Sequence, residues 1–368
     1  MWKDDLKNCI QSADELGKAL DLSDEEVAKI DEVAERFPMR IPQSYLDLVD
    51  PDDPDDPIAK ICIPSVSELS PGGSFDTSGE QSNTKDEGVQ HKYTQTALIL
   101  STNVCAMYCR HCFRKRLVGL TDSELIKQMD AAVSYVRSHP EVTNVLLTGG
   151  DFLMIPNYII RKYFEEFSQI PTIDFIRCGT RIPVSFPQRI TEDPELIEIF
   201  REFVKKKPIY IITQFDHPRE FTDKAKEAIR IFRELGIQVR NQTVLLKGVN
   251  DDPEVLGELF RELTRQEVMP YYVFQCRPVT GVRDRFQVPL LKGVEIVDKA
   301  KSMQNGIGKC FRYCMSHPRG KIEIIGDLGD GNMLFKFHQN KYPEDRSRMF
   351  TVKLDEKSTW LDEELKPE

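Results

Sequence analysis

Three closely spaced cysteines are the residues of this sequence most clearly suited to chemistry. In "CAMYCRHCF" (105–113), Cys105, Cys109 and Cys112 follow one another at spacings of four and three residues. Cysteine thiolates hold iron–sulfur clusters, and three of them leave one iron of a [4Fe–4S] cubane open. A small molecule would complete that iron, as in catalytic metal sites that keep an open position. The alternatives are buried free thiols, or a zinc site completed by His111 or a distant cysteine, although this spacing departs from the paired zinc pattern.

Apolar, β-branched runs show which elements must position this loop. Between most of them lie helical stretches, such as 122–138 and 222–236, and this alternation indicates a parallel sheet covered on both faces. Six similar units without a Gly-x-Gly-x-x-Gly turn favour an α/β fold of the partial (β/α)₆ TIM-barrel type over a doubly wound sheet. The cysteine loop follows the first strand, at the barrel end where chemistry takes place. The six predicted strands span 96–102, 143–149, 173–179, 208–214, 237–246 and 269–276.

The segments outside the predicted barrel have a different composition. Residues 1–48 are predicted to be helical, and "SDEEVAKIDEVAERF" opens with a Ser-x-x-Glu capping box. Residues 50–90 are rich in Pro, Gly and Ser, which indicates a wrapped arm with little regular structure, anchored by "IAKICIPSV". After residue 320, "KIEIIGDLGDGNMLFKFHQ" predicts a β-hairpin. We therefore expect N-terminal helices and arm (1–90), a partial barrel (91–305) and a small β-rich C-terminal tail (306–368).

Composition narrows the classes of partner. The 60 acidic and 50 basic residues give a net charge of −10, which argues against nucleic acid or an anionic membrane as a partner. No apolar run approaches the length of a membrane span, and the N-terminus has no signal pattern. Nine cysteines form a poor disulfide framework and fit reduced thiols. A cytoplasmic protein that acts on a small molecule is predicted.

A second motif ends the second predicted strand. "LLTGGD" places Gly149 at its end and Gly150 and Asp151 directly after it, and glycines allow the backbone to approach a ligand closely. The alternative is a simple turn.

These motifs and several longer segments resemble one known family. The Cys-x₃-Cys-x₂-Cys loop and "GGD" resemble the radical S-adenosylmethionine (SAM) enzymes. The longer segments resemble the lysine 2,3-aminomutase family, and in chain order they are "YLDLVDPDDPDDPIAKICIPSVSEL", "MYCRHCFRKR", "RCGTRIPVSFPQRIT", "NQTVLLKGVND" and "MPYYVFQC".

The resemblance implies a set of cofactors and partners. It implies a [4Fe–4S] cluster on Cys105, Cys109 and Cys112, with SAM on the open iron, whose reductive cleavage gives a 5′-deoxyadenosyl radical that abstracts hydrogen. Pyridoxal 5′-phosphate, a homo-oligomer and an electron donor such as flavodoxin or ferredoxin are also implied.

Carried over position by position, the resemblance assigns further site residues. Gly149, Gly150 and Asp151 would bind the methionine amino group. His111 would pack near the adenine, and Gln242 would lie in the SAM pocket. Arg114 would bind the substrate carboxylate, a role that suits a guanidinium fork. The alternative for Arg114 is a solvated basic loop, because Arg110, Lys115 and Arg116 surround it.

Other positions depart from the family pattern. Lys321 in "HPRGK" is the candidate lysine for pyridoxal phosphate, and the alternative is that it merely begins a strand. Thr96 stands where the family has a phosphate-binding arginine, and Lys92 stands at its second basic position. Gln214 replaces a family histidine.

The expected substrate follows from one further departure. Arg277 stands where lysine-specific members have an aspartate. A cation there would repel a lysine side chain, so a substrate with an acidic or neutral side chain is expected, unless Arg277 is a surface residue. The resulting prediction is an aminomutase-like radical SAM enzyme with a non-lysine substrate. Its rivals are a pyridoxal-independent relative with another hydrogen-abstraction chemistry, and a non-catalytic iron–sulfur protein.

Overall fold

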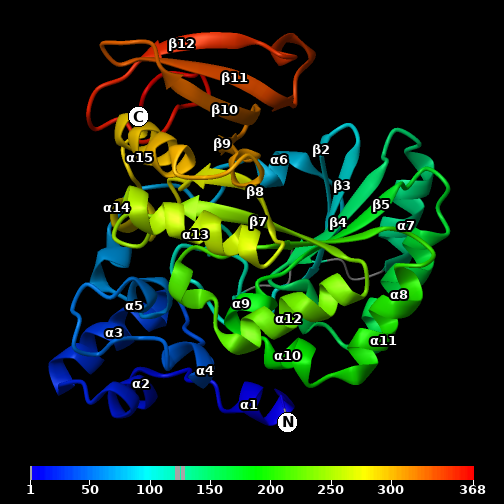
Figure 1. Cartoon of the computed structure of the whole chain (residues 1–368), viewed down its shortest axis with the longest axis horizontal. Helices are drawn as coiled ribbons and strands as arrows, with labels where there is room; N and C mark the ends of the chain where they lie inside the picture. The colour runs from blue at the N-terminus through cyan, green and yellow to red at the C-terminus, as the bar shows by residue number, and fades with distance from the viewer. Residues whose placement is uncertain (1, 121–124, 126–128) are drawn as a thin grey trace.

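The computed structural model describes residues 2–120, 125 and 129–368, and its described strands form one mixed sheet (Figure 1). The strands pair in chain order from β1 to β12. They are β1 (Thr84–Asp86), β2 (Val89–Tyr93), β3 (Thr96–Thr102), β4 (Asn144–Gly149), β5 (Phe175–Gly179), β6 (Ile209–Thr213), β7 (Gln238–Leu245), β8 (Met269–Gln275), β9 (Arg312–His317), β10 (Gly320–Asp327), β11 (Asn332–Asn340) and β12 (Met349–Lys353).

Helices cover this sheet and form the N-terminal end of the molecule. The α-helices are α1 (Trp2–Lys7), α2 (Ala13–Leu20), α3 (Asp24–Arg36), α4 (Gln43–Leu46), α5 (Pro57–Cys62), α6 (Glu80–Asn83), α7 (Met129–Ser138), α8 (Asn157–Ser168), α9 (Ile182–Ser185), α10 (Gln188–Thr191), α11 (Pro194–Phe203), α12 (Asp223–Glu234), α13 (Pro253–Arg265), α14 (Arg283–Phe286) and α15 (Leu290–Ser302). The 3₁₀ turns are η1 (Val66–Leu69), η2 (Phe152–Met154), η3 (Pro218–Glu220), η4 (Ile307–Lys309) and η5 (Pro343–Asp345).

Six parallel strands, β3 to β8, form the centre of the sheet. They confirm the six predicted strands. Neighbouring strands in the sheet follow one another in the sequence, whereas in a doubly wound sheet the strand order reverses direction at one point. Helices separate consecutive strands, and α12 confirms the helix predicted over 222–236. The helix predicted over 122–138 is present from Met129 onward, while 122–124 and 126–128 lie outside the described residues.

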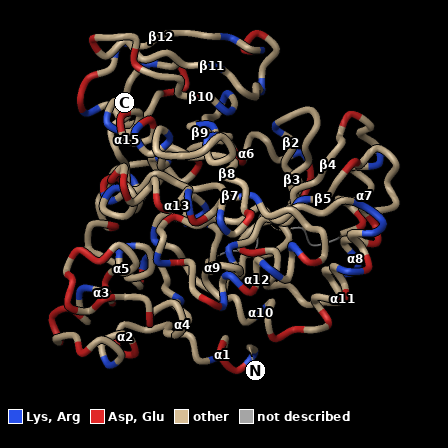
Figure 2. The backbone as a smooth tube through the Cα atoms, in the orientation of Figure 1, with Lys and Arg blue, Asp and Glu red and all other residues tan. Residues whose placement is uncertain are grey.

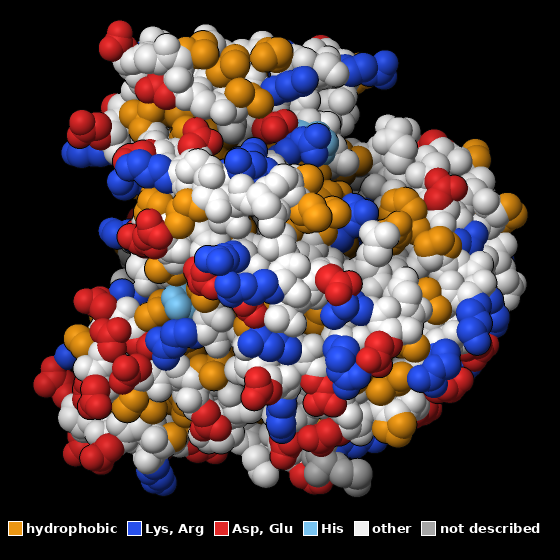
Figure 3. All heavy atoms as spheres, in the orientation of Figure 1, with side chains coloured by type: hydrophobic (Ala, Val, Ile, Leu, Met, Phe, Trp, Pro, Cys, Tyr) orange, Lys and Arg blue, Asp and Glu red, His pale blue; other side chains and the backbone are white. Residues whose placement is uncertain are grey.

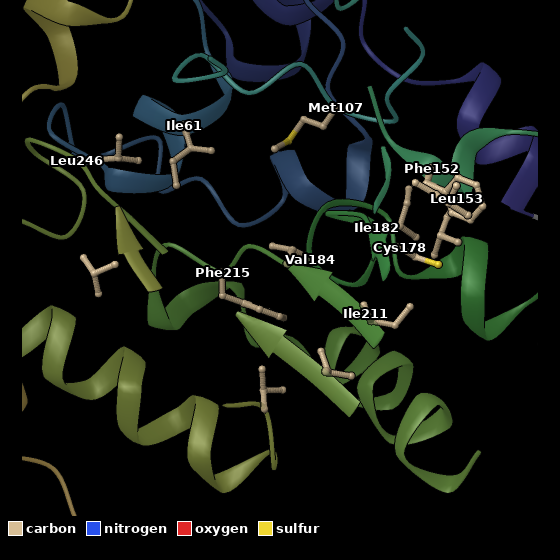
Figure 4. Close-up of a cluster of buried hydrophobic side chains, with 14 of the residues drawn as sticks. Ile61, Met107, Phe152, Leu153, Cys178, Ile182, Val184, Ile211, Phe215 and Leu246 are labelled. Atoms are coloured by element: carbon tan, nitrogen blue, oxygen red, sulfur yellow. The ribbon is translucent and has the colours of Figure 1, made fainter. Parts of the chain in front are cut away.

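Strand periodicity divides the side chains of the central strands between two faces. On the helix-facing side, Val145, Ile176 and Ile211 are fully buried. Phe164 of α8 and Phe200 of α11 pack in the same apolar core, with ring centroids 5.3 Å apart. Figure 4 shows part of this core, to which the N-terminal region and the cysteine loop also contribute side chains. The alternate residues of the same strands line a cavity on the opposite face.

The 50–90 segment contains more regular structure than predicted. Its apolar anchors, Ile58, Ile61 and Cys62, are fully buried, as a wrapped arm requires. Asp56 caps α5 by accepting a hydrogen bond from the Ala59 backbone nitrogen at 2.7 Å. Further along, η1, α6 and β1 follow, and β2 pairs antiparallel with β3. Local capping and strand pairing therefore order a segment whose composition suggested irregular structure. The capping box predicted for α3 is confirmed by Ser23 and Glu26.

The C-terminal segment extends the sheet. The predicted hairpin is confirmed as β10 and β11, which join at a turn where Gly329, Asp330 and Gly331 have positive φ. β9 was not predicted; it pairs parallel with β8 and antiparallel with β10. In Figure 1 the β10–β12 layer and the N-terminal helices lie at opposite ends of the molecule. The sheet runs across residues 90 and 305, and the proposed division at these positions stays a prediction.

Charge and apolarity are distributed unevenly along the chain. Acidic residues are prominent along the N-terminal helices α2 and α3 (Figure 2). Among the described residues, no helix combines the length and apolarity needed to cross a membrane.

Candidate active site

A cavity of about 360 Å³ lies on the inner face of the central strands. Its volume falls in the range typical of pockets for small ligands. The space-filling view is hollowed between the β9–β12 end and the β2–β5 end of the sheet (Figure 3). Every residue predicted for the site lines this cavity, namely Cys105, Cys109, His111, Cys112, Arg114, Gly149, Gly150, Asp151, Gln242, Arg277 and Lys321. The structure thus brings together residues that are up to 216 positions apart (105 to 321); their roles stay predictions.

The cysteine loop is held by the N-terminal region. The backbone nitrogens of Tyr108 and Arg110 donate to the carbonyls of Arg40 and Ile61, at 2.9 and 2.8 Å. The thiols of Cys105, Cys109 and Cys112 are free, and burial raises the pKa of each, so their thiolates need a cationic partner.

The arrangement of these thiols bears on the kind of metal centre that they suit. Among the described residues, no three Cys, His, Asp or Glu side chains converge as a site for a metal ion. A cubane is held by thiolates at separate irons, and the assignment of a cluster to these three cysteines stays a prediction.

Arg181 contacts the cysteine loop and was missed by the sequence reasoning. Its Nη1 donates to the Sγ of Cys109 at 2.9 Å, and its Nη2 donates to Glu220 at 2.6 Å. Glu220 also accepts from the Tyr45 hydroxyl at 2.6 Å, so the guanidinium is fixed from two sides. Arg181 lies two residues after β5, much as Asp151 lies two residues after β4. That position at the C-terminal end of a strand is the signal that could have identified it.

The loop after β4 approaches the cysteine loop closely. A Cβ atom on Gly149, whose φ is +133°, would lie 2.2 Å from the carbonyl oxygen of Thr102, and one on Gly150 would lie 2.5 Å from that of Val104. These glycines therefore make room for neighbouring backbone. The Asp151 carboxylate accepts from the Thr180 hydroxyl and the Arg181 backbone nitrogen, both at 2.6 Å. Burial raises the pKa of Asp151 to about 6.

His111 belongs to a polar group at the ends of β6 and β7. Its Nε2 lies 2.8 Å from the Nε2 of Gln214, which also donates to Asp216 at 2.8 Å. The Nδ1 of His111 is buried and has no hydrogen-bond partner among the described residues. Buried polar atoms are usually hydrogen-bonded, and His111 lines the cavity, so a ligand there is compatible with the predicted contact with adenine. Gln242 lines the same cavity.

Two arginines and one acid form the part of the cavity nearest the arm. Arg114 is buried and donates through Nε and Nη2 to Glu80 of α6, at 3.2 and 3.1 Å, so it is no solvated basic residue. Arg277 also lines the cavity; its Nη1 donates to Ser78 at 2.9 Å and its Cζ lies 4.1 Å from the Phe113 ring centroid.

The charges of this group act strongly on one another. Burial lowers the pKa of Arg277 to about 10. Burial opposes ionisation of Glu80, but Arg114 and Arg277 outweigh it and lower the pKa of this carboxyl. Glu80 was missed because its polar segment has no periodicity that marks a buried acid.

Lys321 is the second residue of β10, and it also lines the cavity, where its role in binding pyridoxal phosphate stays a prediction. Its Nζ lies 4.0 Å from the Tyr272 ring centroid. No described residue forms a hydrogen bond or ion pair with this amine. Burial lowers the pKa of Lys321 to about 8. Lys92 also lines the cavity, where its Nζ donates to the Ser78 carbonyl at 3.3 Å.

Comparison with known proteins gives the class and then the family. The profile of the radical SAM superfamily matches residues 99–260. A protein of Aquifex aeolicus (strain VF5), provisionally assigned as an L-lysine 2,3-aminomutase, is 38% identical over 93% of this chain and 92% of its own length. The glutamate 2,3-aminomutase of Clostridioides difficile (strain 630) is 36% identical over 87% of this chain and 74% of its own.

One more relative and one solved structure are also similar to this chain. The L-lysine 2,3-aminomutase of Clostridium subterminale is 35% identical over 85% of this chain and 73% of its own length. A solved radical SAM methyltransferase from Sphaerobacter thermophilus has a TM-score of 0.35 and 16% identity over 61% of this chain and 68% of its own. The chain belongs to the lysine 2,3-aminomutase family of the radical SAM superfamily, and is therefore an enzyme of the isomerase type.

Proposed function

We propose that this enzyme is a radical SAM aminomutase that moves an amino group between neighbouring carbons of an amino acid with an acidic side chain. The observation that carries the proposal is one cavity that contains the three cysteines, Lys321 and Arg277. The central strands would form the partial (β/α)₆ barrel expected of such an enzyme. Both lysine and glutamate 2,3-aminomutases are among its relatives.

The residues around the cavity fit the cofactors of this chemistry. Cys105, Cys109 and Cys112 would hold the [4Fe–4S] cluster, and SAM would lie against Gly149–Asp151, His111 and Gln242. Lys321 would bind pyridoxal phosphate. When bound, these groups supply a 5′-deoxyadenosyl radical for hydrogen abstraction and an aldehyde that holds the substrate amine. The protein contributes three half-buried thiols and two nitrogens, His111 Nδ1 and Lys321 Nζ, that have no hydrogen-bond partner among the described residues.

The charges near the arm favour an acidic substrate. Three guanidiniums, those of Arg114, Arg116 and Arg277, act on the carboxylate of Glu80, and Asp76 is the other acid that acts on Arg277. A carboxylate of the substrate would offset the remaining positive charge, whereas the ammonium of lysine would add a like charge in a poorly solvated site. Arg277 would bind the distal carboxylate, and Arg114 would bind the α-carboxylate after releasing Glu80.

The remaining expectations concern the setting of the enzyme. Flavodoxin or ferredoxin would supply the electron, the chain would form a homo-oligomer, and it would work in the cytoplasm without nucleic acid or membrane partners. The net charge of −10 supports the last point.

The test is an anaerobic assay of the chain reconstituted with iron, sulfide and pyridoxal phosphate. With SAM and dithionite, L-glutamate should give its β-amino isomer in preference to L-lysine, as followed by chromatography. Cys112→Ala is the matched inactive control. Faster turnover of L-lysine than of L-glutamate would contradict the proposed acidic substrate. Failure to cleave SAM would contradict the proposed radical SAM reaction.

A pyridoxal-independent relative is the second candidate, because Thr96 lacks the charge of the family arginine. SAM cleavage and product formation that need no pyridoxal phosphate would favour it.

A further inference from the structure

Arg177 of β5 carries a charge that no acid balances in the described part of the chain. Its side chain lines the cavity, its Nη2 donates to the Thr96 hydroxyl at 3.5 Å, and its buried Nε has no hydrogen-bond partner. The ionisable groups that interact with it electrostatically are Tyr271, Tyr272, Arg240 and Lys321, none of them an acid side chain of Asp or Glu. Burial lowers its pKa. A desolvated guanidinium without a counter-ion is costly, so an anion from the cavity would stabilise it.

The position of Arg177 relative to Lys321 indicates which anion this is. Arg177 and Arg277 both act electrostatically on the Lys321 amine. Arg277 lies near Glu80 and Ser78, in the part of the cavity closest to the arm. Arg177 lies beside Thr96, where no acid is present among the described residues. Lys321 therefore has two cationic neighbours, and only one of them has a carboxylate close by.

We propose that Arg177, together with the Thr96 hydroxyl, binds the phosphate of the pyridoxal cofactor, an inference that rests on the proposed function. A guanidinium forms charge-assisted, often bidentate hydrogen bonds to phosphate, whereas a hydroxyl donates one neutral bond. Arg177 on the third central strand thus supplies the charge that Thr96 on the first central strand lacks. Lys321 and Arg177 would hold the aldehyde and phosphate ends of one ligand.

Binding of pyridoxal phosphate and of pyridoxal, which lacks the phosphate, tests this assignment. The chain without added SAM is titrated with each aldehyde, and adducts on Lys321 are trapped with borohydride and quantified by mass spectrometry. The unaltered chain should bind pyridoxal phosphate more tightly than pyridoxal, and inorganic phosphate should compete only with the former. Arg177→Gln should weaken pyridoxal phosphate by about tenfold or more and leave pyridoxal unchanged.

Two further variants keep the test independent of misfolding. Arg177→Lys retains the charge and should recover part of the affinity. Arg230→Gln is the control, because Arg230 is an exposed arginine of α12 that forms ion pairs with Glu227 and Glu234 and does not line the cavity. It should leave both affinities unchanged.

The results that would contradict the phosphate site differ from those that would contradict the proposed function. Equal affinities for the two aldehydes, or an unchanged affinity in Arg177→Gln, would overturn the phosphate site while a Lys321 adduct still supports the proposed function. If Arg177→Gln weakens binding of the amino acid substrate but leaves the affinity for pyridoxal phosphate unchanged, Arg177 binds the substrate. That result would also overturn the phosphate site. No adduct with either aldehyde, in a chain that still cleaves SAM, would overturn the cofactor assignment itself.

Discussion

Burial largely sets the chemistry of single residues in this cavity, and Lys321 shows how. Burial lowers the pKa of its amine to about 8, from the value of 10.5 for a solvated lysine. Only the neutral amine attacks an aldehyde. Labelling of Lys321 with pyridoxal phosphate should therefore increase as pH rises, with a midpoint near 8 in rates measured by borohydride trapping and mass spectrometry. A midpoint near 10.5 would mean that the amine is solvated and would contradict this environment.

The cysteines allow a sharper comparison, because the chain has other buried thiols. Cys105→Ala, Cys109→Ala or Cys112→Ala should each lose the cluster iron and SAM cleavage, since two thiolates cannot hold a cubane with one open iron. Cys178 is the matched control, because it is fully buried in the core and does not line the cavity. Cys178→Ala should retain iron and cost on the order of 1 kcal/mol of stability. Iron analysis and visible absorbance decide the outcome, and iron lost from Cys178→Ala would count against the assignment.

Some residues were predictable from the sequence, and others were not. The three cysteines and "GGD" stand directly after strands, so chain position alone placed them at one end of the sheet. Arg177 is the one basic residue in "IDFIRCG", a run that is otherwise apolar after Asp174, and that signal was available. Glu80 had none, because its partner Arg114 lies 34 residues away and only the fold joins them.

At the scale of elements, the arm is tied to the cysteine loop through one acid. Glu68 of η1 is fully buried and forms ion pairs with Arg110 and Lys115 at 2.6 Å and with Arg285 of α14 at 2.7 Å. Burial opposes its ionisation, but the three cations outweigh burial and lower the pKa of Glu68 to about 2. Arg110 lies between Cys109 and Cys112, so Glu68 positions the loop without touching a ligand.

Removing this charge should destabilise the protein. Glu68→Gln leaves three buried cations without their counter-ion, at a cost of about 3–5 kcal/mol in urea unfolding at pH 7. Because the folded pKa is depressed, the carboxylate contributes its full stability above about pH 4.5, and that contribution is lost as pH falls toward 2. Glu25→Gln, which removes an exposed ion pair with Lys29, is the control and should leave the unfolding midpoint unchanged. Equal midpoints for both variants would contradict the role of Glu68.

Element boundaries followed the strength of the local signal. The β-branched runs of β3 to β8 are continuous and apolar, and all six were predicted. The strand β9, "RYCMSH", has no such run, and pairing with both β8 and β10 makes it a strand. In the arm, α6 and β1 are short, and their contacts with distant residues could not be predicted from local composition.

At the scale of the whole molecule, three regions enclose the cavity. The arm contributes Ser78 and Glu80, the central strands contribute their inner faces, and β10 contributes Lys321. The cysteine loop follows β3, the first central strand. Lys321 lies on β10, one of the strands that extend the sheet beyond β8. Substrate preference therefore depends on residues far apart in the sequence, and Arg277 after the last central strand is the one that tests it most directly.

Arg277→Asp reverses the charge opposite the substrate side chain and should shift preference from L-glutamate toward L-lysine. The unaltered side chain is half-buried beside Ser78 and Phe113, so solvent screens its charge only in part, and a carboxylate in its place would attract an ammonium. The measurement is the ratio of kcat/KM for the two amino acids in anaerobic assays, where each tenfold change corresponds to about 1.4 kcal/mol in the transition state. Arg283→Asp, at an exposed side chain of α14 that does not line the cavity, is the matched control and should leave the ratio unchanged. An equal ratio in all three proteins, with SAM cleavage intact, would show that Arg277 does not face the substrate, although the cluster and the fold would be unaffected.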